Sequence, residues 1–398
     1  MPMIKPEKIY SKILIPIILF LLVFSCKNYN DIVYTYKSPE NLNDSLKVAS
    51  ISDVKIDSNL IYQAIKRIKG GALGQTHSIL IYRNTKLVVE EYFPGNKYKW
   101  DAPGHYGEYM HWSKNDLHNI MSVNKSITAA CIGIAIDKGM IKSVKQSIFD
   151  YLPEHQQFNN NGKENITIEH LLTMTSGLDW TEWGVDYSSH DNPIIGIWFS
   201  VKDPVSFILD APLVHKPGTY FSYYGGNQIL LGEILKNATG IKIDEFSSKY
   251  LFEPLAIHHV EWTNTFKNGV IECAANLKMT PRDMLKFGIT FLNDGRWNQT
   301  QLISQNWIKK SSQPYANNID IEIPGEDSGK VRYAYSWWTK EHLKGNKKMD
   351  IFMALGWGGQ KIIIIPEKKA VIVFTGGEYN SGTNQFSLFE DYILPAMK

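Results

Sequence analysis

The sequence has few cysteines and lacks the patterns that mark several common site types. Its 398 residues include only 3 cysteines, and no Cys-x-x-Cys or His-Glu-x-x-His pattern occurs, so no metal site is predicted. The chain also has no Gly-x-Ser-x-Gly elbow, Walker A loop or dinucleotide fingerprint, and we expect no cofactor. His258 and His259 have no third ligand nearby in the sequence and indicate a surface turn. The formal charge of +2 favours no nucleic-acid partner.

No apolar run is long enough to span a bilayer, which takes about 20 helical residues. The longest N-terminal run, 13–24, follows three lysines and precedes Ser25 and Cys26. A basic stretch, a short apolar core and a small residue before the cleavage site predict a signal peptide over 1–25. The segment resembles a bacterial lipoprotein box, which implies a lipidated Cys26 and an exported lipoprotein in the cell envelope. An ordinary signal or a buried helix is the alternative.

Residues 26–50 are polar and lack periodicity, which predicts a flexible tether between lipid and domain. One domain is expected over 51–398, and the sequence leaves its oligomeric state open. Cys131 lies in an apolar helical pattern and is expected to be a buried residue without a disulfide.

Secondary-structure patterns place strands near both ends of the domain and helices between them. Apolar spacing predicts helices over 58–69, 168–174, 229–235 and 386–394, the last stopped by Pro395, and a mainly helical region over about 123–255. Strands are predicted over 78–82, 87–93, 361–365 and 370–375, with a polar, aromatic loop over 94–118. We therefore expect an α/β (α+β) fold in which both ends of the domain build one sheet flanked by helices, with a helical subdomain inserted.

Ser-x-x-Lys occurs at Ser52–Lys55 and at Ser122–Lys125. The motif alone is weak, and the neighbouring residues distinguish the two copies. Ser52 follows the polar segment, whereas Ser122 opens a well-patterned apolar helix, where free N–H groups and the helix dipole favour developing negative charge. Lys125, at i+3, returns to the same helix face and can serve as the base that a serine nucleophile needs. The alternative is a helix cap at Ser122 with a solvated lysine.

Several segments around this motif support the catalytic interpretation. They are His118-Asn-Ile-Met-Ser-Val-Asn-Lys-Ser-Ile-Thr, Tyr151-Leu-Pro-Glu154, Ile166-Thr-Ile-Glu-His-Leu-Leu-Thr-Met-Thr-Ser-Gly-Leu178, Pro217-Gly-Thr219 and Met279-Thr-Pro-Arg-Asp283. Together they resemble the penicillin-binding protein and serine β-lactamase-like superfamily from about residue 58 to the C-terminus. The resemblance implies an antiparallel β-lactamase/transpeptidase-like sheet and Ser122 as nucleophile.

The second element of that superfamily usually reads Tyr-x-Asn, and the aligned stretch here is Tyr223-Tyr224-Gly225. The resemblance assigns Tyr223 as general acid and base, with Tyr224 as the competing candidate and a core aromatic as the other interpretation. Gly225 stands in place of the substrate-orienting Asn. This Tyr-x-Gly form resembles the branch of class C β-lactamase-like esterases and 6-aminohexanoate-oligomer hydrolases.

The third element, Lys/His-Thr-Gly in the superfamily, aligns with Trp357-Gly358-Gly359-Gln360. Trp357 replaces the cation and cannot pair with a substrate carboxylate. Gly358 and Gly359 allow the backbone to come close to a substrate, although a simple turn into the strand is the alternative. The resemblance implies an oxyanion hole made by the backbone N–H groups of Ser122 and Gln360.

Three functions follow from these observations. The first is a serine hydrolase that cleaves a small ester or amide through a Ser122 acyl-enzyme. The second is a peptidoglycan D-Ala peptidase or β-lactamase, which export favours and the missing Lys/His disfavours. The third is a non-catalytic cell-envelope binding protein with the same fold.

Overall fold

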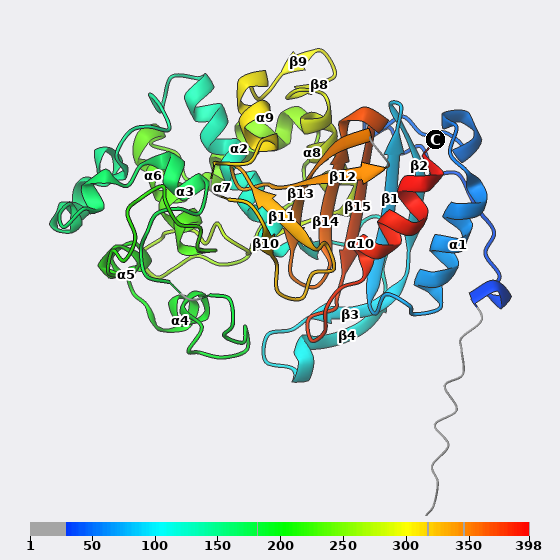
Figure 1. The fold of residues 1–398 in the computed structure, drawn as a ribbon, viewed down its shortest axis with the longest axis horizontal. Helices are drawn as coiled ribbons and strands as arrows, with labels where there is room; N and C mark the ends of the chain where they lie inside the picture. The colour runs from blue at the N-terminus through cyan, green and yellow to red at the C-terminus, as the bar shows by residue number, and fades with distance from the viewer. Residues whose placement is uncertain (1–28, 181, 317, 345–346, 398) are drawn as a thin grey trace, which may run out of the picture.

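An eight-stranded antiparallel sheet forms the centre of the computed structural model, which describes residues 29–180, 182–316, 318–344 and 347–397 (Figure 1). The N-terminal strand β1 pairs with the C-terminal strand β15, so both ends of the domain share one sheet, as the sequence predicted. In spatial order the strands are β10 (Ile321–Glu322), β11 (Lys330–Tyr333), β12 (Trp338–Lys344), β13 (Lys347–Gly356), β14 (Gln360–Ile365), β15 (Ala370–Gly376), β1 (Thr76–Arg83) and β2 (Lys86–Tyr92).

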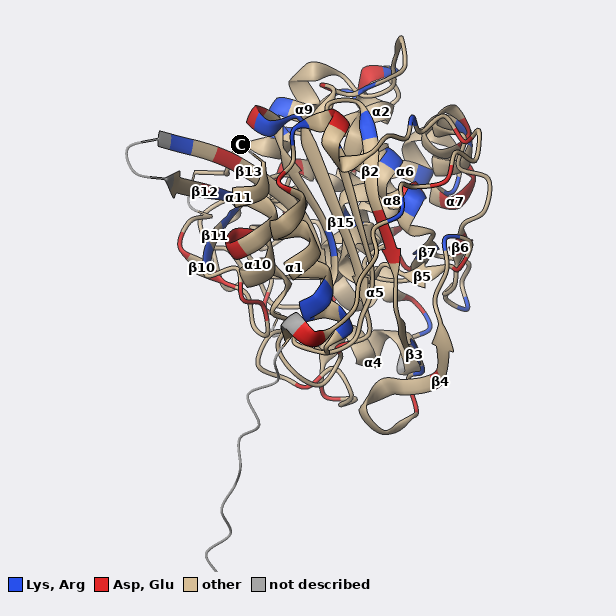
Figure 2. Ribbon diagram, turned by 90° about the vertical axis from the view of Figure 1, so that its right-hand side faces the viewer, with Lys and Arg blue, Asp and Glu red and all other residues tan. Residues whose placement is uncertain are grey.

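Helices cover both faces of this sheet. Helix α8 (Pro281–Leu292) packs against β14 and β15. Helix α1 (Ser58–Lys69) and the C-terminal turns α10 (Gln385–Leu388) and α11 (Leu394–Ala396) lie together on the other side (Figure 2). In the same view, basic and acidic residues are mixed over the elements rather than sorted into faces of one sign.

The region beside the sheet is helical. It holds α2 (Asn124–Asp137), α3 (Ile168–Leu172), α4 (Pro193–Ser200), α5 (Pro204–Asp210), α6 (Gly226–Thr239) and α7 (Ile243–Ser247). Among the described residues from 124 to 255, no strand occurs. Helix α2 is buried from Asn124 to Ala135 and packs against α6, so it is the central helix of this region.

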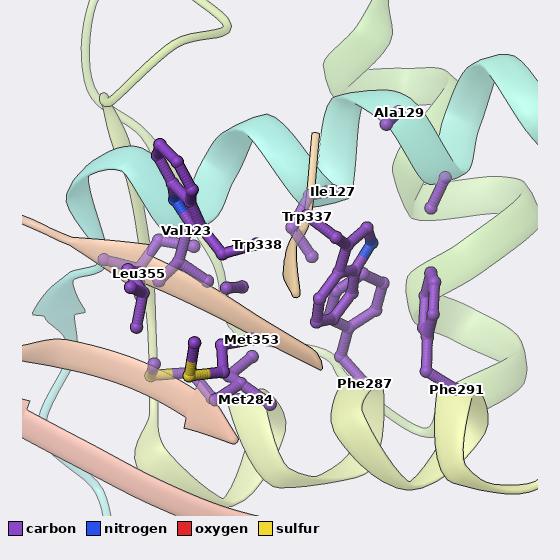
Figure 3. Packing of buried hydrophobic residues seen from close by; sticks show 14 of the residues in the cluster. Val123, Ile127, Ala129, Met284, Phe287, Phe291, Trp337, Trp338, Met353 and Leu355 are labelled. Carbon is purple, nitrogen blue, oxygen red and sulfur yellow. The ribbon is translucent and has the colours of Figure 1, made fainter. Parts of the chain in front are cut away.

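The hydrophobic core joins α2 to the sheet. Figure 3 shows Val123, which caps α2, and Ile127 of α2 together with Phe287 and Phe291 of α8 and the indole of Trp337. The ring of Trp337 lies 4.5 Å from that of Phe291 and 5.8 Å from that of Phe287. Because these side chains are almost fully buried, the start of α2 is held at a fixed place beside β13.

Three predictions of secondary structure and chain organisation differ from the structure. Residues 94–118 are not only loop, because β3 (Pro94–Tyr98) and β4 (Tyr106–His111) form a hairpin. The C-terminal helical stretch does not stop at Pro395, which lies inside α11, where the first turn tolerates proline. The part of the predicted tether that the structure describes, 29–50, lies against the domain: Leu46 is buried and the Tyr36 hydroxyl donates to the Val88 carbonyl.

The predicted signal peptide 1–25 and the predicted lipidation site Cys26 lie outside the described residues. Within the described part, no helix combines the length and the apolar character needed to cross a membrane. Cys131 and Cys273 are buried free thiols.

Candidate active site

Ser122 sits in a tight turn between the short strand β5 (His118–Asn119) and α2. The preceding residue, Met121, has φ 49°, a left-handed conformation that costs energy for a residue with a side chain. Its N–H donates to Asn119 Oδ1 at 3.1 Å, which stabilises the turn. The turn therefore presents Ser122 at the edge of a cleft, two residues before the buried start of α2.

Lys125 lies directly behind the serine. Its Nζ is 2.9 Å from Ser122 Oγ and donates to the Ala274 carbonyl at 3.1 Å. The side chain is buried, and this desolvation lowers the pKa of Lys125 below its usual range. A lysine with a lowered pKa carries a lone pair more readily and can take a proton from the serine.

Two buried carboxylates, Glu182 and Glu272, oppose that effect by raising the pKa of Lys125. Glu272 accepts hydrogen bonds from the backbone N–H groups of Ala274 and Asn276, so it also fixes the carbonyl that holds Lys125. Sequence reasoning missed both acids. They lie 60 and 150 positions after the serine and belong to no motif, and only the replacement of Asn by Gly225 pointed to a change nearby.

Tyr223 is the tyrosine that lies beside Ser122. It lines the cleft beside Ser122, its hydroxyl contacts the serine, and its ring lies 4.9 Å from Lys125 Nζ. Trp183 stacks on this ring at 4.9 Å. Burial raises the pKa of Tyr223, and Glu182 raises it further, so the phenol keeps its proton.

The competing candidates lie elsewhere. Tyr224 is fully buried, stacks on Trp180 at 4.0 Å and donates its hydroxyl proton to the Ile208 carbonyl. Ser52 and Lys55 lie at an exposed turn, η2 (Ile51–Val54). Gly225 does not line the cleft, and its N–H donates to Glu182.

The hairpin between β13 and β14 forms the opposite wall, but in a different register from the one predicted. Gly356, Trp357 and Gly358 line the cleft, whereas Gly359 and Gln360 do not. A Cβ on Gly356 would lie 2.5 Å from the Ile120 carbonyl oxygen and 3.1 Å from Ser122 N, so only glycine allows this approach.

The prediction of Gln360 as an oxyanion donor is therefore corrected. Gln360 is fully buried, does not line the cleft and is paired with Gly356 where β14 begins, so its backbone N–H is not placed at the substrate. The backbone N–H groups of Ser122 and Trp357, by contrast, form no hydrogen bond within the part of the chain that the structure describes.

The cleft has a volume of about 520 Å³ and is lined by aromatic and acidic residues. The aromatic ones are Trp183, Tyr187, Tyr223, Trp338, Trp357 and Tyr379, and the acidic ones are Glu182, Asp186, Glu326 and Glu378. No lysine, arginine or histidine lines it among the described residues. The nearby Lys361 is fully buried and forms an ion pair with Glu326, so its charge is not available to a substrate.

Comparisons of the sequence with family models and with known proteins agree on one family. The sequence matches the Beta-lactamase family over residues 62–376. It is 25% identical to the 6-aminohexanoate-dimer hydrolase of Paenarthrobacter ureafaciens over 315 residues, covering 75% of this chain and 71% of that protein. It is 27% identical to protein flp of Staphylococcus aureus strain NCTC 8325 over 249 residues, 58% of this chain but only 48% of flp.

Two solved structures share the fold. A family VIII carboxylesterase superposes with a TM-score of 0.64 at 16% identity, covering 85% of this chain and 97% of the esterase. An octameric penicillin-binding protein homologue from Pyrococcus abyssi superposes with a TM-score of 0.63 at 19% identity, covering 85% of this chain and 77% of the homologue.

Proposed function

The chain belongs to the Beta-lactamase family and is a hydrolase of that fold, and we propose that it cleaves ester or amide bonds through a covalent acyl-enzyme on Ser122. The observation that carries the proposal is the 2.9 Å contact between Ser122 Oγ and the buried Lys125 Nζ, at the edge of an aromatic cleft. The names of the 6-aminohexanoate-dimer hydrolase and the carboxylesterase are consistent with amide and ester substrates.

The opposite pKa shifts divide the proton transfers between two residues. Lys125, whose pKa is lowered, takes the proton of Ser122 as the hydroxyl oxygen attacks the substrate carbonyl carbon. Tyr223, whose pKa is raised, donates its proton to the leaving oxygen or nitrogen, and Lys125 returns a proton to it. Water then attacks the acyl-enzyme by the same transfers in reverse, which releases the acid and restores Ser122.

The oxyanion hole is assigned to the backbone N–H groups of Ser122 and Trp357. Both groups lack a partner in the described chain, and Gly356 brings the hairpin against the nitrogen of Ser122. Removing one such donor from a hydrolase costs roughly 3–4 kcal/mol of transition-state stabilisation.

The cleft favours neutral or cationic substrates over carboxylates. Glu326 is neutralised by Lys361, but Glu182, Asp186 and Glu378 also line the cleft and no cation of the described chain does, so the cleft disfavours a substrate carboxylate. This argues against a β-lactamase or D-Ala peptidase, because those enzymes act on carboxylate-bearing substrates.

The experiment compares p-nitrophenyl butyrate, p-nitrophenyl hemisuccinate and a chromogenic cephalosporin, with Ser122→Ala as the control. We expect turnover of the neutral ester, at least about 10-fold weaker kcat/KM for the charged ester, and no cephalosporin turnover. Preference for the cephalosporin would support the β-lactamase alternative. Absence of any turnover would support the binding-protein alternative.

We further propose that the protein is exported and anchored by a lipid on Cys26. The basic residues, the short apolar run and the Cys at that position support this location. A small ester or amide in the cell envelope would then be the substrate.

A further inference from the structure

Glu182 is a buried acid whose hydrogen bonds hold the segment that carries Tyr223. Its carboxylate accepts from the backbone N–H of Gly225 at 2.7 Å and from Trp180 Nε1 at 3.1 Å. The hydroxyl of Tyr187 donates to the other carboxylate oxygen at 3.0 Å. Gly225 comes two residues after Tyr223 and caps α6, so this carboxylate ties the loop after α3 to the junction between Tyr223 and that helix.

Gly225 leaves the space that the carboxylate occupies. A Cβ on Gly225 would lie 3.0 Å from Glu182 Oε2 and 2.9 Å from Ile194 Cδ1. A side chain at 225 and the carboxylate of Glu182 therefore compete for one volume. Gly225, which replaces the usual Asn, thus leaves room for the carboxylate of Glu182, which comes from another part of the chain.

Glu182 also faces the proton-transfer groups. It lines the cleft with Ser122 and Tyr223, and its negative charge raises the pKa of both Lys125 and Tyr223. The other charged group acting on Lys125 is Glu272. Tyr187 and Tyr333 also face Tyr223, and burial and then their neighbours raise the pKa of both phenols. Within the described chain the Glu182 carboxylate accepts from the neutral donors of Gly225, Trp180 and Tyr187 and from no cation, so its charge acts on Lys125 and Tyr223 through space.

We propose that Glu182 is a positioning residue of the hydrolytic site: its carboxylate holds Tyr223 beside Ser122 through the backbone N–H of Gly225, and it lines the same cleft as these two residues. This inference rests on the proposed acyl-enzyme function. It assigns to one acid the orienting task that the missing Asn cannot perform.

Two substitutions separate position from charge. Glu182→Gln keeps the size of the side chain and removes its charge, which lowers the pKa of Lys125. The low-pH limb of the kcat/KM profile, where Lys125 becomes protonated, should therefore move to lower pH by roughly one unit. Its kcat should fall roughly 10-fold, the size of one buried hydrogen bond to a charged group. Glu182→Asp keeps the charge but is too short to reach Gly225, so kcat should fall with little movement of the limb. Asp179→Asn, an exposed acid of the same loop outside the cleft, is the matched control and should behave as wild type.

The results distinguish the two hypotheses. If the wild type hydrolyses the ester and Glu182→Gln has the same kcat and the same low-pH limb, the inference is overturned and the proposed function stays intact. A wild type that neither reacts at Ser122 nor hydrolyses an ester overturns both. Should Glu182→Gln not fold, Gly225→Ala provides the test, because its methyl group presses on the carboxylate. A folded Gly225→Ala protein with normal kcat overturns the inference, and a roughly 10-fold loss supports it.

Discussion

Lys125 Nζ lies 2.9 Å from Ser122 Oγ, and its other hydrogen bond runs to the Ala274 carbonyl rather than to a carboxylate. A buried ammonium paired directly with an acid would keep its proton. Here Glu272 accepts from the backbone N–H of Ala274 and raises the pKa of Lys125 without a direct hydrogen bond to the ammonium in the described chain. The site thus combines a nearby base with surroundings that let it release its proton.

Replacing Lys125 by Met should abolish most activity. Met fills a similar apolar volume but has no lone pair on nitrogen, so kcat/KM should fall roughly 10³-fold. Lys125→Arg should be equally impaired, because a guanidinium stays protonated. Steady-state kinetics on p-nitrophenyl butyrate measures both, with thermal unfolding as the check on folding. Activity of Lys125→Arg within 10-fold of wild type would contradict Lys125 as base, a threshold set well below the roughly 10²–10⁴-fold contribution of a general base.

Tyr223→Phe should affect amides more than activated esters. The phenyl ring keeps its stacking on Trp183, but the proton for the leaving group is lost. An amine must be protonated to leave, whereas p-nitrophenolate leaves unaided. We expect a loss of roughly 10²–10⁴-fold on an anilide and about 10-fold on the p-nitrophenyl ester. An equal loss on both substrates would mean that Tyr223 does not serve as the acid.

The contact between Ser122 and Lys125 could be predicted because the two residues are three positions apart and helix geometry brings them together. The hairpin register could not, because Gly356, Gly358 and Gly359 offer several alignments and only the approach to Ser122 N selects one. Glu182 was missed because its partner Gly225 lies 43 positions away and a single acid carries no periodic signal. The β3–β4 hairpin was missed because glycines and polar residues hide its alternation.

The packing of His77 and His118 predicts acid sensitivity. Both are buried, and Trp112 stacks on them at 4.6 and 3.9 Å. Burial lowers the pKa of His77 to about 2 and that of His118 to about 3. The unfolded chain therefore binds more protons below the ordinary pKa of about 6.5. The stabilisation is complete above that pH and is lost as the pH falls toward the folded values.

Each histidine should lower the unfolding free energy by up to about 1.4 kcal/mol per pH unit in this range. Urea unfolding at pH 7, 6 and 5 measures the slope in wild type and in His118→Phe. The variant should lose about half of the histidine contribution. An identical slope in the two proteins would show that His118 is protonated equally in both states.

Lipidation at Cys26 can be tested in cells. Wild type should fractionate with membranes, whereas Cys26→Ala should appear in the soluble fraction because no thiol remains to carry the lipid. Cys131→Ala is the control and should stay with the membranes. Membrane association of Cys26→Ala equal to that of wild type would argue for an anchor other than a lipid on this cysteine.

The most direct test of the acyl-enzyme mechanism is labelling of residues 27–398 with a fluorophosphonate, read by intact mass beside Ser122→Ala. We predict one adduct on the wild type, mapped to Ser122, and none on the variant. Equal labelling of both proteins, or an adduct mapped to another residue, would contradict Ser122 as the nucleophile.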